Sequence, residues 1–229
     1  MVCLVLSIIL FTSRGVFAQS AGPTTSASTQ PAAAVDQTTP RGALKVFFAA
    51  DAGSDGASLQ SVLLADGPAQ QHMVDALSGQ KTADRTLTDA LKSKFPDQWK
   101  VDPREEQQKQ LPGVYDTIDK AAQTLEGQTA TLKVGDGPAP PLTLKNVNGQ
   151  WRIPLASLIQ SIDNEKIDSD AHQIDIQIKV MQAAATDVSS GKYATQALAV
   201  EDIKKRMLTA ALDDHAASTQ PALHATTQP

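Results

Sequence analysis

The sequence predicts a single α+β domain with a helix-rich N-terminal part, a small antiparallel β-sheet and a C-terminal helical hairpin. The prediction rests on the spacing of apolar residues, which is helical at first, alternates between about residues 128 and 154, and is helical again afterwards. Residues 19–38 and 213–229 are rich in Ala, Ser, Thr, Pro and Gln and poor in large apolar residues. Such segments bury too little apolar surface to fold, so we expect a disordered linker, a domain over residues 39–212 and a disordered tail.

The N-terminus has the features of an export signal. Residues 2–11 form an apolar run of about ten residues, shorter than the roughly 20 that a membrane-spanning helix needs. Val16-Phe17-Ala18 fits the small-residue pattern of a signal peptidase site. We therefore expect residues 1–18 to be a signal peptide cleaved after Ala18, which leaves an exported protein, periplasmic or extracellular, without a stable membrane span. Cys3 is the only cysteine, so the mature chain would contain no disulfide.

The charge pattern argues against nucleic acid as a partner. Without Arg14, 19 basic residues remain against 25 acidic ones, a formal charge of −6. The charges of both signs are mixed along the chain, and no basic stripe of the kind that contacts phosphate backbones is present.

Three helical segments are predicted before residue 96. Thr39 is a suitable N-cap and Pro40 a suitable first residue for the first helix. A second helix is expected to end at Asp66-Gly67-Pro68. The third pattern, residues 69–95, is expected to be interrupted near Ser78-Gly79, because glycine weakens a helix.

The next segment is predicted to contain one short strand and one helix. Gln98–Val101, which includes a tryptophan, fits a short strand. A helix is expected to begin after Pro103, where two glutamates complement the helix dipole. Its helical spacing continues to Leu125, with Gly127 as the expected stop.

The predicted sheet centres on one hairpin. Thr129–Val134 alternates polar and apolar residues, as a half-buried strand does. Asn148-Gly149, between two β-prone runs, is a strong signal for a tight hairpin turn. Trp151 in the return strand has two interpretations: it fills the core between sheet and helices, or it forms the wall of a ligand site. The core interpretation is the stronger of the two.

The C-terminal third is predicted to be helical. Residues 174–180 fit a strand and a helix, and the helix is favoured because nothing separates them from the Ala-rich residues that follow. Ser189-Ser190-Gly191 is expected to end this helix. A last helix is expected over about 194–212, with Leu198, Ile203 and Leu208 facing inward. Its i,i+4 charge pairs are expected to form a solvated face: Glu201 with Lys205, and Asp202 with Arg206.

Three segments, taken in chain order, resemble the NTF2-like (cystatin-like, cone-shaped α+β) superfamily over about residues 40–155: PRGALKVFFAA (Pro40–Ala50), the alternation in Thr129–Val134, and VNGQWRI (Val147–Ile153). The resemblance implies a curved antiparallel sheet around a long helix, often with an enclosed pocket. It also implies that an enzyme of this type, such as a ketosteroid isomerase or scytalone dehydratase, would place Tyr, Asp or His side chains in that pocket.

Residues suited to such chemistry are present, but none lies in a local motif that assigns it a role: Tyr115, Asp116, Tyr193, His72 and His172. Tyr115 is expected at the edge of the core, and Tyr193 is expected to anchor the packing of the last two helices. Catalytic residues are therefore unknown from the sequence.

No metal site or cofactor is expected. The acidic stretch 163–172 does not match a calcium-binding loop, because Gln173 occupies the glycine position and Lys179 the position of the bidentate glutamate. The four histidines are scattered without the paired spacing of a zinc site.

The function favoured by the sequence is that of an exported, non-catalytic domain that binds a protein partner or a small ligand and forms a possible homodimer. Trp151 and Tyr115 are the candidate ligand-binding residues. The alternative is an NTF2-like enzyme of isomerase or dehydratase type that acts on a small apolar substrate, which requires a cavity lined by a tyrosine together with an aspartate or histidine.

Overall fold

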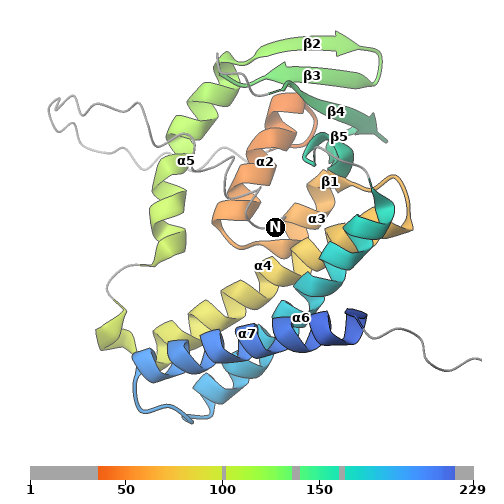
Figure 1. Cartoon of the computed structure of the whole chain (residues 1–229). Coiled ribbons are helices and arrows are strands. Elements are labelled where there is room, and N and C mark those ends of the chain that lie inside the picture. The colour runs from red at the N-terminus through yellow and green to blue at the C-terminus, as the bar shows by residue number, and fades with distance from the viewer. Residues whose placement is uncertain (1–35, 100–101, 136–139, 160–162, 220–229) are drawn as a thin grey trace, which may run out of the picture. The chain divides into compact units, whose positions relative to one another are not determined.

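The structure is a computed structural model, and it describes residues 36–99, 102–135, 140–159 and 163–219 (Figure 1). It has the predicted α+β class, with a five-stranded sheet and helices that pack partly on the sheet and partly on one another. The expected signal peptide (1–18), nearly all of the expected linker and the last ten residues of the expected tail lie outside the described residues.

The first two helices are held by side-chain caps. In α2 (Pro40–Ala52), the hydroxyl of Thr39 accepts a hydrogen bond from the Gly42 amide at 3.0 Å, which confirms the predicted N-cap. The carboxylate of Asp55 caps α3 (Gly56–Val62) in the same way, because it accepts from the Ser58 amide at 3.2 Å.

Helix α4 (Pro68–Lys94) is continuous, so the predicted interruption near Ser78-Gly79 is wrong. Both residues serve contacts with other helices. The Ser78 hydroxyl donates to the Gly56 carbonyl at 2.8 Å, and a Cβ on Gly79 would lie 2.9 Å from Cδ1 of Ile178. One glycine costs a helix only about 1 kcal/mol, and the packing of α4 against α6 outweighs that cost.

The chain between α4 and the sheet differs from the prediction at both ends: a helical turn replaces the predicted strand at its start, and the following helix is shorter than predicted. A 3₁₀ turn, η2 (Pro96–Gln98), leads into Trp99, so the predicted strand is wrong for residues 98 and 99, while residues 100–101 lie outside the described residues. Helix α5 (Pro103–Lys120) begins as predicted, with Asp102 as its N-cap, but it ends well before Leu125.

The sheet has the strand order β1-β5-β4-β3-β2. Its strands are β1 (Leu63–Leu64), β2 (Ala122–Glu126), β3 (Thr129–Lys133), β4 (Leu142–Val147) and β5 (Gln150–Pro154). Strands β3 to β5 are antiparallel, as predicted, and β2 pairs with β3 in the same antiparallel sense. Strand β1 joins β5 in parallel and makes the sheet mixed.

Strand β2 replaces the predicted end of a helix. Leu125 pairs with Ala130 of β3 across a turn in which Gly127 has a φ of 60°. That left-handed conformation suits glycine, so the residue predicted to stop a helix instead turns a hairpin. The Asn148-Gly149 turn is confirmed, and both of its residues have positive φ, 55° and 83°.

One face of the sheet is part of the core. Its buried residues are Ala130, Leu132, Leu144, Trp151 and Ile153. Helices α2 and α3 pack against β5, and Figure 1 shows α2 beside the sheet. The Trp151 amide also donates to the Gln37 carbonyl at 2.8 Å, which holds the start of the described chain at β5.

Helices α6 (Asn164–Ser189) and α7 (Gln196–Thr219) form the predicted C-terminal hairpin. The helical interpretation of residues 174–180 is confirmed, and α7 continues beyond Leu212. Helix α6 packs mainly against α4, and α7 packs on α6. A second, helical core lies among these three helices and includes Leu87, Leu91, Phe95, Met181, Val188 and Tyr193. None of the described helices is both long and apolar enough to cross a membrane.

Candidate functional site

The two residues proposed from the sequence as ligand contacts lie on different elements. Trp151 in β5 is only 8% exposed, as expected of a residue that fills the core between sheet and helices. Tyr115 lies on α5, partly buried, with Nζ of Lys45 5.6 Å from its ring centre, and burial raises the pKa of the Tyr115 hydroxyl. Neither residue lines the groove described below.

The other candidate side chains are also spread over the molecule. Asp116 forms an ion pair with Lys120 on α5 at 2.6 Å. His172 of α6 lies 3.3 Å from a carboxylate oxygen of Asp214 on α7. Tyr193 precedes α7, and its hydroxyl donates to Asp202. Each of these side chains has its own partner.

His72 cross-links α4 and α6. Its Nδ1 lies 2.7 Å from Asp168 and its Nε2 lies 2.9 Å from Asp175, two aspartates separated by two helical turns. These hydrogen bonds, first that of Asp168 and then that of Asp175, raise the pKa of His72. Ionised carboxylates only accept, so both contacts together require a proton on each ring nitrogen, which is the imidazolium form.

This histidine is a poor candidate for metal binding or for base catalysis. The two carboxylates contact opposite nitrogens of the ring, so the three side chains do not surround a common point. Over the ranges that the structure describes, no group of three or more His, Cys, Asp or Glu residues could hold a metal ion. Both ring nitrogens are engaged, so neither is free to accept a proton from a substrate.

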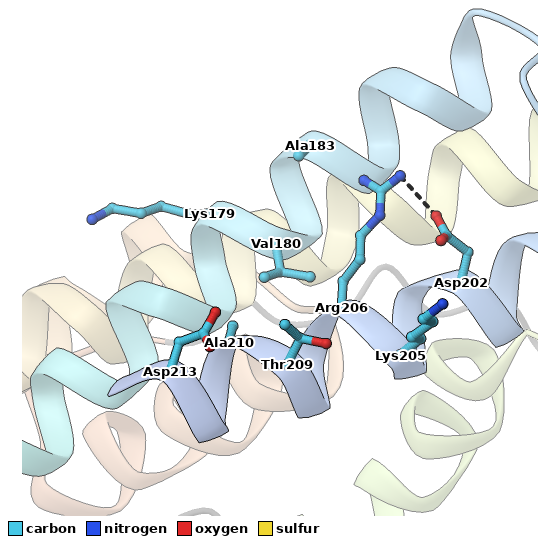
Figure 2. Close-up of a pocket in the computed structure, with 9 residues that line it drawn as sticks. All are labelled: Lys179, Val180, Ala183, Asp202, Lys205, Arg206, Thr209, Ala210 and Asp213. Atoms are coloured by element: carbon cyan, nitrogen blue, oxygen red, sulfur yellow. Dashed lines mark ion pairs between the residues drawn. The ribbon is translucent and has the colours of Figure 1, made fainter. Parts of the chain in front are cut away.

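An open groove of about 440 Å³ lies between α6 and α7 (Figure 2). Val180 and Ala183 of α6 and Ala210 of α7 supply its apolar lining, and Figure 2 shows Val180 between the two helices. Lys179 and Lys205 contribute positive charge to its lining. Neither lysine has an ion-pair partner among the described side chains.

Asp202 and Arg206, which line the groove, belong to a set of mutually bonded polar side chains. We call this set the Arg206 cluster: Asp187, Tyr193, Asp202 and Arg206. The guanidinium of Arg206 lies 2.7 Å from Asp202, as the dashed line in Figure 2 marks, and 3.1 Å from the Tyr193 hydroxyl. Asp187 belongs to α6, so the cluster joins the two helices. The predicted i,i+4 pair of Asp202 with Arg206 is confirmed, but both side chains also bond to Tyr193, so the face that they form is only partly solvated. The anchoring role predicted for Tyr193 is confirmed.

The cluster also shifts the ionisation of its members. Burial, and then the hydrogen bond to Asp202, raise the pKa of Tyr193 to about 12. The same hydrogen bond lowers the pKa of Asp202. Hydrogen bonds from Lys192 and Arg206 lower the pKa of Asp187. Near neutral pH the tyrosine is therefore uncharged and the carboxylates are charged. The cluster holds α6 and α7 together and has no group poised for proton transfer.

The outward face of α7 carries three exposed leucines. Leu198, Leu208 and Leu212 are 52%, 64% and 61% exposed. With Glu201 and Lys205 between them they form one face of the helix, which we call the α7 stripe: Leu198, Glu201, Lys205, Leu208 and Leu212. Lys205 also lines the groove, so the stripe and the groove are adjacent.

Two predictions about α7 are wrong. Leu198 and Leu208 face outward, whereas Ala199, Ile203 and Met207 pack toward the helical core. A spacing of five residues turns a helix by about 140° beyond a full turn, so Leu198, Ile203 and Leu208 do not share a face. The predicted Glu201–Lys205 ion pair is also absent among the described side chains. The sequence signal that could have predicted the stripe is the alternating spacing of three and four residues between its members, from Leu198 to Leu212.

Comparisons with protein-family models, with curated proteins and with solved structures find no significant match to this chain. The candidate site therefore rests on the geometry of α6 and α7.

Proposed function

We propose that this chain is an exported, non-catalytic domain that binds a protein partner on the α7 stripe and the adjoining groove. The observation that carries the proposal is the exposure of three leucines on one helical face. Exposed apolar side chains that lie together beside charged groups are typical of interaction surfaces, and Leu208 and Leu212 lie one helical turn apart on the stripe. Here Glu201, Lys205 and Lys179 supply the charge.

The shape of the surface favours a protein over a small molecule. Small ligands are held in concave sites that bury most of their surface. The stripe lies on the convex side of a helix, and the neighbouring groove is open. Helices recognise other helices through side chains at intervals of three, four and seven residues, and the five members of the stripe, two charged residues included, follow one another at intervals of three and four. A helical partner would use both the stripe and the groove edge at Lys205.

The partners of the polar side chains support a non-catalytic role. His72 uses both ring nitrogens between α4 and α6, and Tyr193 is held in the Arg206 cluster. The alternative function, an isomerase or dehydratase of the NTF2-like type, would place its pocket against one face of the sheet. Leu132, Leu144 and Ile153, on the face that belongs to the core, are completely buried, which favours the binding domain.

Site-specific photocrosslinking in the producing cells tests this proposal. Leu208 is replaced by the photoreactive residue p-benzoylphenylalanine, and the matched control carries it at Lys109, an exposed position on α5. We expect a defined protein adduct from position 208 that is absent from position 109. Adding Leu212→Glu should remove it, because a charge in the stripe opposes apolar docking. Equal adducts at both positions, or none at position 208, would contradict the proposal.

A further inference from the structure

We propose that the partner is a second copy of this chain, and that two α7 stripes pair antiparallel with Leu198 of each copy against Leu208 of the other. This inference rests on the proposed function of the stripe as a docking surface. The observation that carries it is that Glu201 and Lys205 lie between two exposed leucines, Leu198 and Leu208. Neither charged residue has an ion-pair partner among the described side chains.

The spacing of the stripe is that of a coiled-coil seam. From Leu198 to Leu212 its members follow one another in steps of three, four, three and four residues, which are the a and d positions of two heptads. In an antiparallel pair of helices, an a position of one helix meets a d position of the other. Leu198 is an a position and Leu208 is a d position, so these two leucines satisfy this rule.

Two-fold symmetry then determines the remaining contacts. If Leu198 meets Leu208 of the second copy, symmetry makes Leu208 meet Leu198, and Glu201 meets Lys205 twice between them. The interface is two leucine layers around two ion pairs. Leu212 lies near the start of the other α7. Both charges that lack a partner in the single chain obtain one, and the stripe is complementary to itself.

Charge excludes the competing arrangements. In a parallel, in-register pair, Glu201 would face Glu201 and Lys205 would face Lys205. In the other antiparallel register, with Leu198 against Leu212, the two Lys205 side chains would meet at the symmetry axis. Like charges placed opposite each other cost an interface several kcal/mol. Only the register with Leu198 against Leu208 gives every charge of the stripe an opposite charge.

The single chain does not need this contact in order to fold. The inner face of α7 already packs in the helical core through Ala199, Ile203 and Met207. The paired part of the stripe, from Leu198 to Leu208, spans about 15 Å of helix at 1.5 Å per residue, which is short for a stable interface of roughly 1,200–2,000 Å². We therefore expect a reversible dimer with a dissociation constant in the micromolar range, about 1–100 µM.

Sedimentation equilibrium of the purified chain, from about 1 µM to about 1 mM, tests the pairing. The variants Glu201→Lys and Lys205→Glu each place like charges opposite one another, so each should weaken the dimer at least about tenfold. Mixing the two variants should restore dimers as heterodimers, because each chain then meets the opposite charge. The double variant E201K/K205E should restore the homodimer. Lys109→Glu on α5 is the matched control, with the same charge change outside the stripe and no expected effect.

The outcomes separate this inference from the proposed function. A monomer at every concentration, or a dimer that the single charge reversals leave unchanged, overturns the pairing. If such a monomer still gives a position-208 adduct with a different protein, the proposed function stands and only the second copy is wrong. If neither a dimer nor an adduct forms, both are wrong. An adduct of two copies, together with rescue in the mixture, supports both.

Discussion

At the scale of single residues, His72 makes one helix contact depend on pH. Its raised pKa means that the folded chain holds the proton more tightly than the unfolded chain does. The stability that His72 gives the folded chain is therefore fully present below its pKa in the unfolded chain, which is about 6.5. It is lost as the pH rises through the folded value, because the neutral ring donates to only one of the two aspartates. Asp168 and Asp175 of α6 are the charged groups bonded to the ring, and no side chain of α4 forms a hydrogen bond or ion pair with it.

We expect His72→Asn to reduce the fall in stability between pH 6 and the mildly alkaline range. Urea unfolding followed at several pH values measures this, and proton NMR titration of the His72 ring should give a pKa above about 6.5. Asp175→Asn should lower that pKa, because one of its hydrogen-bonding causes is removed. The matched control, His172→Asn, should leave the pH dependence in place. A His72 that titrates at or below the reference value would contradict the assignment.

Tyr193 gives a second prediction at this scale, at high pH. Its pKa of about 12 lies above the ordinary value of 10.0, so the stability due to its neutral hydroxyl is present below about pH 10. That stability is lost as the pH rises from there through about 12. Tyr193→Phe should remove the component of the ultraviolet titration that appears near pH 12 and cost about 1 kcal/mol.

Tyr115→Phe is the comparison for that experiment, because its hydroxyl has no hydrogen-bond partner among the described residues. It should cost less stability and leave the late titration in place. A late titration that survives Tyr193→Phe and disappears with Tyr115→Phe would show that the Arg206 cluster is not its source.

At the scale of elements, the junction of α3 and α4 depends on the absence of one side chain. Gly56 is buried at the start of α3, and a Cβ there would lie 2.2 Å from the backbone oxygen of Ser78. A backbone atom in the middle of α4 has no room to move away, so the two helices would have to separate. Close packing of this kind is a tertiary requirement on a glycine that local sequence does not reveal.

We therefore expect Gly56→Ala to destabilise the domain by about 1–3 kcal/mol or more, as overpacking does. The matched control is Gly113→Ala in α5, where a Cβ meets nothing within 4 Å. There the higher helix propensity of alanine should stabilise by up to about 1 kcal/mol. Thermal unfolding of both variants measures the difference. Equal effects of the two substitutions would show that α3 and α4 are not closely packed at Gly56.

At the scale of the whole molecule, α4 connects two cores. Met73, Val74 and Leu77 in its first half are buried, and Leu87 and Leu91 in its second half belong to the helical core. Helix α6 runs along it and contributes to the same helical core. Helix α3, which contacts the sheet, and the α6–α7 hairpin therefore both pack on α4, α7 through its contact with α6.

The proposed export also concerns the whole molecule. Cleavage after Ala18 would leave a chain that begins at Gln19, and the mass of the protein recovered from the medium or periplasm should match it. Replacing Ala18 by a large charged residue, Ala18→Arg, should block cleavage, because signal peptidase requires a small residue at this position. Recovery of an unprocessed chain only from the cytoplasm would contradict export.

The sequence by itself determined those features that depend on neighbouring residues. Thr39 and Pro40 define the start of α2, Asn148-Gly149 defines a hairpin turn, and the lack of a breaker after residue 180 makes residues 174–180 helical. Caps, turns and breakers act within a few residues, so a single chain segment contains all the information that they require.

Only the tertiary structure decided the features that depend on distant partners. Residues 122–126 follow a helical spacing, yet they form β2 because β3 pairs with them across Gly127. Gly79 does not interrupt α4 because Ile178 of α6 packs on it. The same is true of the candidate site: which leucines of α7 face outward depends on where α6 and α4 cover the helix. Backbone pairing and side-chain burial join segments that are far apart in the chain. The local spacing of apolar residues does not show which distant segments will pair or pack together.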